Sequence, residues 1–97
     1  MKAYEIAEKA ANLIAGDRAE THGDKHKTFA RIAAYWTVYL QNRPNPEAPI
    51  SAVDVGFMMA DLKKARVQGG QLNVDDFVDF CGYGACAGEI AMRATRR

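Results

Sequence analysis

The chain has 97 residues and a formal net charge of +1, with 48% hydrophobic and 26% charged residues. This length and composition predict one folded domain over residues 1–97 and exclude a disordered tail. The small net charge argues against a nucleic-acid partner, and no apolar run approaches the roughly 18 residues that span a bilayer. Cys81 and Cys86 are too few for a disulfide scaffold, so we expect a reduced, cytoplasmic chain in which both are small core residues.

Helical spacing predicts two helices in the first half of the chain. Residues 4–15 place apolar side chains on one face and are followed by Gly16, a typical C-terminal stop. A second helix begins at Asp24, which is an acceptable N-cap, and continues to about Gln41, because the prolines of the next segment exclude a helix interior there. Its apolar stripe is predicted to consist of Phe29, Ile32, Ala33, Trp36 and Leu40.

The third predicted helix covers residues 53–67. Ser51 opens it with Asp54 three residues later, a variant of the capping box. The helix is apolar on most of its circumference, which is typical of a helix buried in more than one interface. One small bundle cannot cover that much apolar surface, so we expect a homodimer with an interface at or near Phe57, Met58 or Met59.

The fourth predicted helix begins near Asn73. It contains Gly82, Gly84 and Gly88, each of which costs on the order of 1 kcal/mol relative to alanine in a helix interior, so we expect a neighbouring backbone or a ligand to come close there. Its expected core face consists of Phe77, Phe80, Cys81, Gly84, Ala87, Gly88 and Ala91. The four elements predict an all-α fold, a compact bundle of about four helices completed by homodimerisation.

Carboxylates occur on both of the last two helices. Asp76 and Asp79 lie one turn apart with Tyr83 one turn further on, and such a pair can hold Mg²⁺ together with phosphate oxygens. Acidic residues near a helix N-terminus also complement the helix dipole, which leaves a purely structural role open. On the third helix, Asp61 either pairs with Lys64 or faces the other two carboxylates across the bundle, where a cation would offset their repulsion.

The connection between the first two helices is polar. Arg18 is a candidate bidentate contact for an anion in a loop that closes over a ligand, and simple exposure to solvent is the alternative. His22 and His26 have the spacing of a helical metal pair, but Gly23 between them and the lack of further soft ligands argue against zinc.

Three stretches carry a resemblance to a known family: AGDRAETHGDKHKTFARIAAYWTVYL, DVGFMMADLKKARV and DDFVDFCGYGACAGE. In this order, over about residues 7–91, they resemble a family of short bacteriophage and prophage proteins with no assigned activity. The first block of that family typically reads Gly-Asp-Arg-x-x-x-Tyr-Gly. Here His22 replaces the tyrosine, so an imidazole must take the role of the aromatic ring at this position.

A looser similarity points to the all-α, MazG-like nucleoside triphosphate pyrophosphohydrolases, which bind Mg²⁺ through acidic helical motifs. The segment from Asp76 to Asp79 is similar to the second of these motifs, whereas the first motif, two glutamates one turn apart, is missing. The similarity implies a nucleotide-binding protein with Mg²⁺ as cofactor that splits the α–β phosphate bond. The expected metal ligands are Asp61, Asp76 and Asp79; the expected phosphate contacts are Arg18 and Lys64; the expected nucleotide contacts are His22, Trp36 and Tyr83.

A second class of function stays open, a non-enzymatic helical adaptor that binds a host or phage protein. Both classes place the chain in the host cytoplasm, without a nucleic-acid or membrane partner. A thermal shift with Mg²⁺ and nucleoside triphosphates separates them, because a ligand that binds only the folded chain raises its stability.

Overall fold

A computed structural model describes residues 1–16 and 24–95, the last two of these in backbone only. The described residues form four α-helices and no strand, as predicted: α1 (Ala3–Ala15), α3 (Lys25–Gln41), α4 (Ala52–Gly69) and α5 (Val74–Thr95). None of these helices combines the length and hydropathy that a membrane span requires.

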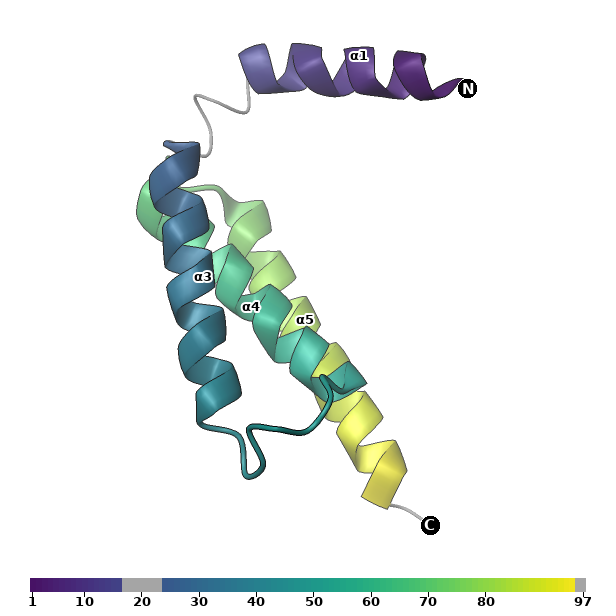
Figure 1. Cartoon of the computed structure of the whole chain (residues 1–97), viewed down its shortest axis with the longest axis vertical. Coiled ribbons are helices and arrows are strands. Elements are labelled where there is room, and N and C mark those ends of the chain that lie inside the picture. The colour runs from purple at the N-terminus through teal and green to yellow at the C-terminus, as the bar shows by residue number, and fades with distance from the viewer. Residues whose placement is uncertain (17–23, 96–97) are drawn as a thin grey trace.

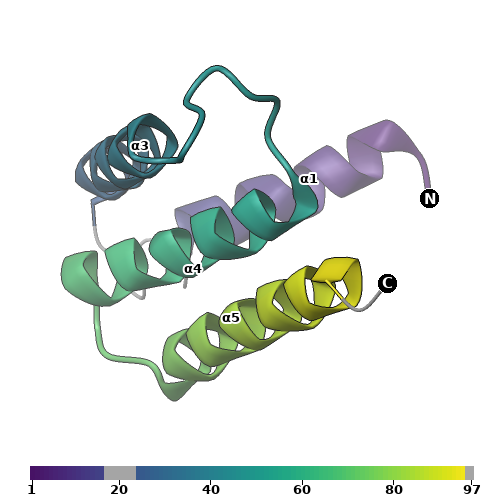
Figure 2. The same cartoon turned by 90° about the horizontal axis from the view of Figure 1, so that it is seen from below.

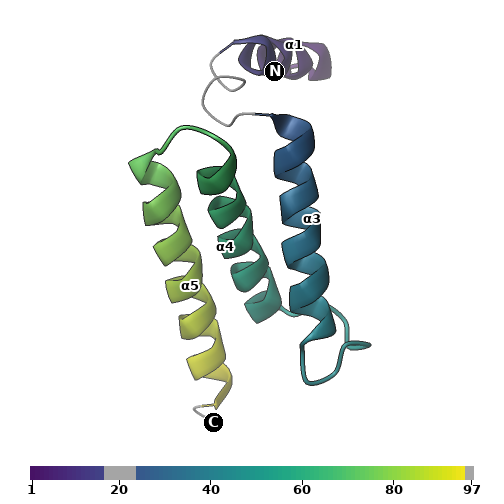
Figure 3. The same cartoon turned by 90° about the vertical axis from the view of Figure 1, so that its left-hand side faces the viewer.

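Three of the helices, α3, α4 and α5, lie side by side in one layer with α4 in the middle (Figures 1, 2 and 3). Helix α4 packs against α3 on one side and α5 on the other, and among the described residues α3 and α5 do not contact each other. The expectation that the third helix is buried in more than one interface is therefore met by two helices of its own chain. Both interfaces are intramolecular, so the apolar circumference of α4 does not by itself call for a dimer.

Helix α1 lies apart from this layer (Figure 1). It contacts none of the other described helices, and all of its residues are exposed. The predicted bundle of four helices is thus a layer of three packed helices with a fourth helix beside it. Accordingly the radius of gyration is 16.1 Å, compared with about 12.5 Å for a compact domain of this length.

Side-chain caps fix the beginnings of α3 and α4 where the sequence predicted them. The Asp24 carboxylate accepts hydrogen bonds from the backbone N–H groups of His26 (2.8 Å) and Lys27 (3.4 Å). The Ser51 hydroxyl accepts from the N–H of Asp54 (3.1 Å), and the Asp54 carboxylate accepts from the N–H of Ser51 (2.8 Å). These bonds satisfy backbone donors that a helix start leaves unpaired.

The face of α3 that meets α4 differs from the predicted stripe. Ile32 is buried as expected, but Phe29 is 71% exposed, and Tyr39 faces the layer instead. Tyr39 and Trp36 face α4 because their aromatic side chains carry polar groups that form hydrogen bonds with α4. The Trp36 indole N–H donates to the Met58 carbonyl (2.6 Å), and the Tyr39 hydroxyl donates to the Asp54 carboxylate (2.6 Å).

The face of α5 that meets α4 also differs from the prediction. Only Ala87 of the expected core face is buried, and the α4 side of the helix otherwise presents a more polar stripe with Asp76 and Tyr83. The expected core residues Phe77 and Phe80 are exposed, and so are both cysteines. The apolar face of α5 therefore points away from its own chain.

The close backbone approach occurs on α4, not at the glycines of α5. A Cβ atom at Gly56 would lie 2.6 Å from the Ala87 Cβ and 3.2 Å from the Tyr83 carbonyl oxygen. At Gly82, Gly84 and Gly88 a Cβ would meet no described atom within 4 Å. No backbone of the described chain comes close to the α5 glycines, and the tight contact between helices belongs to Gly56.

Candidate functional site

At one end of the layer α3 begins, α4 ends and α5 begins (Figure 3), and each of the three helices carries polar residues near this end. A Cβ atom at Gly69 would lie 2.5 Å from the Arg31 Nη1 atom and 2.7 Å from the Thr28 Oγ1 atom, so a glycine at this position allows α3 to approach the end of α4. We call this region the polar end, and it consists of Thr28 and Arg31 on α3, Lys63 and Gly69 on α4, and Asp76 and Asp79 on α5.

Asp76 is the most unusual residue of the polar end. Its residue exposure is 4%, and its carboxylate makes no hydrogen bond or ion pair with any residue that the structure describes. Only its backbone N–H is bonded, to the Asn73 carbonyl (3.1 Å) in the first turn of α5. Because an unpaired carboxylate at a buried residue is costly, Asp76 is a candidate ligand for a cation.

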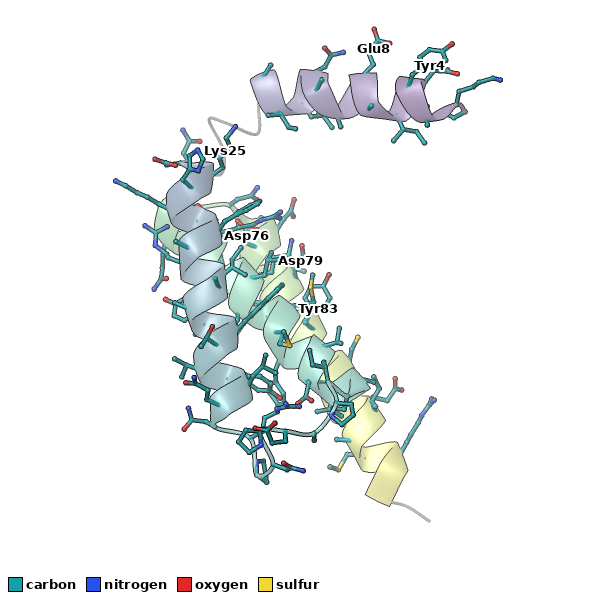
Figure 4. All side chains as sticks on the ribbon, viewed as in Figure 1. Tyr4, Glu8, Lys25, Asp76, Asp79 and Tyr83 are labelled. Atoms are coloured by element: carbon teal, nitrogen blue, oxygen red, sulfur yellow. The ribbon has the colours of Figure 1, made fainter. Side chains whose placement is uncertain are left out.

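Asp79 lies one turn further along α5, and Tyr83 follows one turn later (Figure 4). The Asp79 carboxylate forms a 3.0 Å ion pair with the Lys63 ammonium group of α4. The Lys63 side chain is largely buried, whereas the Asp79 side chain is half exposed. Lys63 was not predicted from the sequence, because Lys63 and Lys64 are equally good candidates until the two faces of α4 are known.

Arg31 was also missed from the sequence, although it holds the second unpaired group of the polar end. Its Nη1 atom is buried and has no hydrogen-bond partner in the described part of the chain. A charged residue at helical spacing between buried Thr28 and half-buried Tyr35 is the signal that could have identified it. A guanidinium with unused donors suits an anion such as a phosphate or a carboxylate.

Asp61 and Lys64 lie on the opposite side of α4 from Lys63. Their side chains form a 3.2 Å ion pair, and the Lys64 ammonium lies 4.2 Å from the centre of the Tyr35 ring of α3. Of the two alternatives for Asp61, the structure contains the ion pair with Lys64. Residues 1–16 and 24–95 gather no group of three His, Cys, Asp or Glu side chains that could hold a metal ion.

The other predicted site residues are distributed as follows. The Trp36 indole is engaged with the Met58 carbonyl and thus joins α3 to α4. Tyr83 lies on the same stripe of α5 as Asp76 and Asp79. The predicted phosphate contact Arg18 and the predicted nucleotide contact His22 lie outside the described residues.

A second polar cluster lies at the far end of the layer, around Arg43 in the loop between α3 and α4. Its guanidinium donates to the Asp54 carboxylate (2.9 Å) and to the carbonyls of Leu40, Pro46, Ala48 and Pro49. The cluster lines a hollow of about 490 Å³. Since Arg43 and Asp54 are already paired, they stabilise the loop and leave no free charge for a ligand.

The same cluster shifts two titrating groups. Hydrogen bonds from the Ser51 N–H and the Tyr39 hydroxyl hold the pKa of Asp54 well below its ordinary value, and Arg43 adds to the effect. Burial, followed by the hydrogen bond to the Asp54 carboxylate, raises the pKa of Tyr39 to about 12. The lowered pKa keeps the Asp54 carboxylate charged, and the raised pKa keeps the Tyr39 hydroxyl protonated. Both shifts therefore preserve the hydrogen bond between the two side chains, as expected of a structural cluster.

Comparison with known proteins identifies related phage sequences. A family model described as a domain of unknown function, DUF6378, matches residues 5–91. The Gene 55 protein of Mycobacterium phage D29 is 36% identical over 85 residues, covering 88% of this chain and 52% of that protein. The Gene 55 protein of Mycobacterium phage L5 is 33% identical over 78 residues, covering 80% and 47%.

The chain thus spans about half the length of these curated relatives. No solved structure matches it. The matches confirm the resemblance to phage proteins that the sequence indicated.

Proposed function

The chain belongs to the DUF6378 family, and we propose that it binds a magnesium–nucleotide complex at its polar end. One observation carries the proposal: this end holds the buried residue Asp76, whose carboxylate forms no hydrogen bond or ion pair with the described residues, and a buried Arg31 guanidinium nitrogen that has no hydrogen-bond partner among them. The two groups do not pair with each other in the structure. A ligand that carries both a cation and a phosphate would satisfy both groups at once.

The carboxylates of α5 fit magnesium. This cation is commonly held by one or two carboxylates, with the remaining positions filled by water and substrate phosphates, so Asp76 and Asp79 are sufficient ligands. Bound there, magnesium would neutralise phosphate charge and lower the barrier for attack by water on phosphorus. Asp61 stays with Lys64 on the other side of α4 in this proposal.

Lys63 gives the site a way to accept the ligand. In the structure its ammonium group is paired with the Asp79 carboxylate at 3.0 Å. We infer that Lys63 turns to a phosphate when the ligand binds, which frees the Asp79 carboxylate for the cation. Arg31 holds a second phosphate, and Tyr83, further along the same stripe, contacts the nucleotide.

The reaction that fits this arrangement is pyrophosphohydrolysis. Water adds to the α-phosphorus of a nucleoside triphosphate, and the bond from that phosphorus to the α–β bridging oxygen breaks. The products are a nucleoside monophosphate and pyrophosphate. The developing negative charge on the pyrophosphate is stabilised by Arg31 and Lys63.

The functional unit that we propose is a homodimer. The chain exposes 7313 Å² of surface, whereas a compact monomer of this mass exposes about 5,500 Å². Among the described residues no large side chain is fully buried. The excess, on the order of 1,800 Å² per chain, is in the range that a stable dimer buries.

The binding proposal is tested by thermal unfolding with Mg²⁺ alone and with Mg²⁺ plus each of a panel of nucleoside triphosphates. A ligand at 100 times its Kd adds about 2.7 kcal/mol of stability, which raises the melting temperature measurably. Asp76→Asn and Arg31→Met should abolish this response. Asp75→Asn, an exposed neighbour of Asp76, and Arg93→Met, at the far end of α5, are matched controls that should keep it.

The variants without ligand give a second readout. Asp76→Asn removes an unpaired buried charge, so its unfolding free energy without ligand should equal or exceed that of the wild type. A wild type that responds to none of the triphosphates, or an Asp76→Asn protein that responds fully, would refute nucleotide binding at the polar end.

The alternative function, a helical adaptor for a host or phage protein, is favoured by α1. This helix has apolar and polar faces, yet all of its residues are exposed; Tyr4 and Glu8 point away from the layer (Figure 4). An amphipathic helix of this kind typically lies in the apolar groove of a partner. Failure of every triphosphate in the thermal test would favour this second function.

A further inference from the structure

The outer face of α5 has a regular pattern that nothing in the described chain covers. Phe77, Cys81, Gly84, Gly88 and Ala91 follow one another at alternating spacings of four and three residues, and we call this line the α5 seam. The first four are exposed. Spacings of this kind, averaging 3.5 residues, are typical of the contact line between two paired helices.

We propose that a second copy of the chain covers this face, with the two α5 helices packed antiparallel and Gly84 at the two-fold axis. The inference rests on the proposed homodimer and names its interface. It differs from the expectation that Phe57, Met58 or Met59 lies at the interface; α3 and α5 of the same chain flank α4, and Phe57 is 47% exposed.

The distribution of large and small side chains supports an antiparallel pair. The first half of the seam carries Phe77, with Phe80 beside it, and the second half carries Gly88 and Ala91. With Gly84 on the axis, each Phe77 lies opposite the partner's Ala91, and each Phe80 lies opposite the partner's Gly88. Large side chains then fill the space above small ones, which is how packed layers reach full density. A parallel pair would place the phenylalanines against each other.

The position of Gly84 supports the same arrangement. It lies near the middle of α5 (Val74–Thr95), so a two-fold axis there lets the helices overlap along their whole length of about 33 Å. A two-fold interface uses the same patch on both copies and closes on itself. At Gly84 and Gly88 a Cβ would meet no described atom within 4 Å, so this part of the face has room for a second backbone.

The area and the composition of the face fit a second copy. Phe77 is 50% exposed and Phe80 is 43% exposed. The chain as a whole, α1 included, exposes on the order of 1,800 Å² more than a compact monomer, and each partner of a standard interface buries roughly 800 Å². The seam lies about a quarter turn around α5 from the stripe that faces α4, so pairing along it does not displace α4.

Cysteine cross-linking tests the seam directly in the full chain, with both natural cysteines changed by Cys81→Ser and Cys86→Ser. In this background Gly84→Cys should form a disulfide dimer on mild oxidation, because the two-fold axis brings its copies together. Phe77→Cys alone should not cross-link, since its two copies lie about 21 Å apart along the helices, far beyond the about 7 Å limit between Cα atoms. A mixture of Phe77→Cys and Ala91→Cys proteins should cross-link.

If Gly84→Cys disturbs the close contact between the two α5 helices and fails to cross-link for that reason, the mixture of Phe77→Cys and Ala91→Cys proteins still tests the seam. Cross-linking of Phe77→Cys alone would show a parallel pair and overturn the proposal. Light scattering on the same samples distinguishes a failure of the α5 seam from a failure of the homodimer. A dimer mass with no cross-link in the mixture or at Gly84→Cys overturns the α5 seam but leaves the homodimer, whereas a monomer mass at all concentrations overturns both.

Discussion

Gly56 on α4 lies so close to Ala87 on α5 that a Cβ atom at Gly56 would be 2.6 Å from the Ala87 Cβ. Real Cβ atoms do not approach each other to this distance, so the helices would have to separate. This pair therefore sets the distance between α4 and α5, and with it the position of the α5 carboxylates relative to α4.

The first prediction follows from this contact. Gly56→Ala should destabilise the fold by about 1–3 kcal/mol through overpacking, measured by urea unfolding. Gly82→Ala is the matched control, because a Cβ there meets no described atom within 4 Å. That variant should be neutral or more stable, by up to about 1 kcal/mol, since alanine favours a helix. Equal effects of the two substitutions would show that α4 and α5 do not approach closely at Gly56.

A second prediction concerns the attachment of α3. Trp36→Phe removes the indole N–H that donates to the Met58 carbonyl at 2.6 Å, while an aromatic ring stays in place. Losing such a bond typically costs about 1 kcal/mol, and the unfolding free energy should fall by this amount. Phe29→Leu, on the exposed side of α3, should change it much less. A Trp36→Phe protein as stable as the wild type would contradict the attachment.

The third prediction concerns alkaline pH. The pKa of Tyr39 is raised to about 12, so the folded state binds this proton more tightly than the unfolded state does. The resulting stabilisation is complete below about pH 10 and is lost as the pH rises towards about 12. The stability difference between the wild type and Tyr39→Phe should therefore change over this window. A stability difference that stays constant over this window would contradict the raised pKa of Tyr39.

The fourth prediction concerns acid. Because hydrogen bonds from Ser51 and Tyr39 lower the pKa of Asp54 in the folded state, the carboxylate stabilises the fold above about pH 4, and this contribution is lost as the pH falls further. The melting temperature of Asp54→Asn should depend less steeply on pH below about 4 than that of the wild type. Identical slopes for the two proteins would contradict the role of the Asp54 carboxylate.

Local signals predicted the helices well. Asp24 and Ser51 are side-chain caps whose hydrogen-bond partners lie within three residues, so a short stretch of sequence is enough to predict them. The central position of α4 also followed from its apolar circumference. In both cases the deciding interactions are local or depend on composition alone.

The faces of α3 and α5 were harder to predict, because hydrophobicity alone did not decide them. Tyr39 and Trp36 turn towards α4 through their hydroxyl and indole groups, while the purely apolar side chain of Phe29 stays outside. On α5 the apolar side chains of Phe77 and Phe80 are exposed, whereas Asp76 is buried.

The candidate site was predicted in part. Asp76 and Asp79 were identified because two carboxylates one turn apart share a helix face. Arg31 and Lys63 were missed, since their neighbours belong to other helices and are set by the packing of α4 between α3 and α5.

The most direct test of cation binding at the polar end is a titration with Mn²⁺, which resembles Mg²⁺ and is detected by electron paramagnetic resonance. Free Mn²⁺ gives a strong signal that is lost on binding. With a nucleoside triphosphate present, wild type and Asp75→Asn should take up additional Mn²⁺ beyond that bound by the nucleotide alone, and Asp76→Asn should not. Equal Mn²⁺ uptake by wild type and Asp76→Asn would contradict the assignment of the cation to this carboxylate.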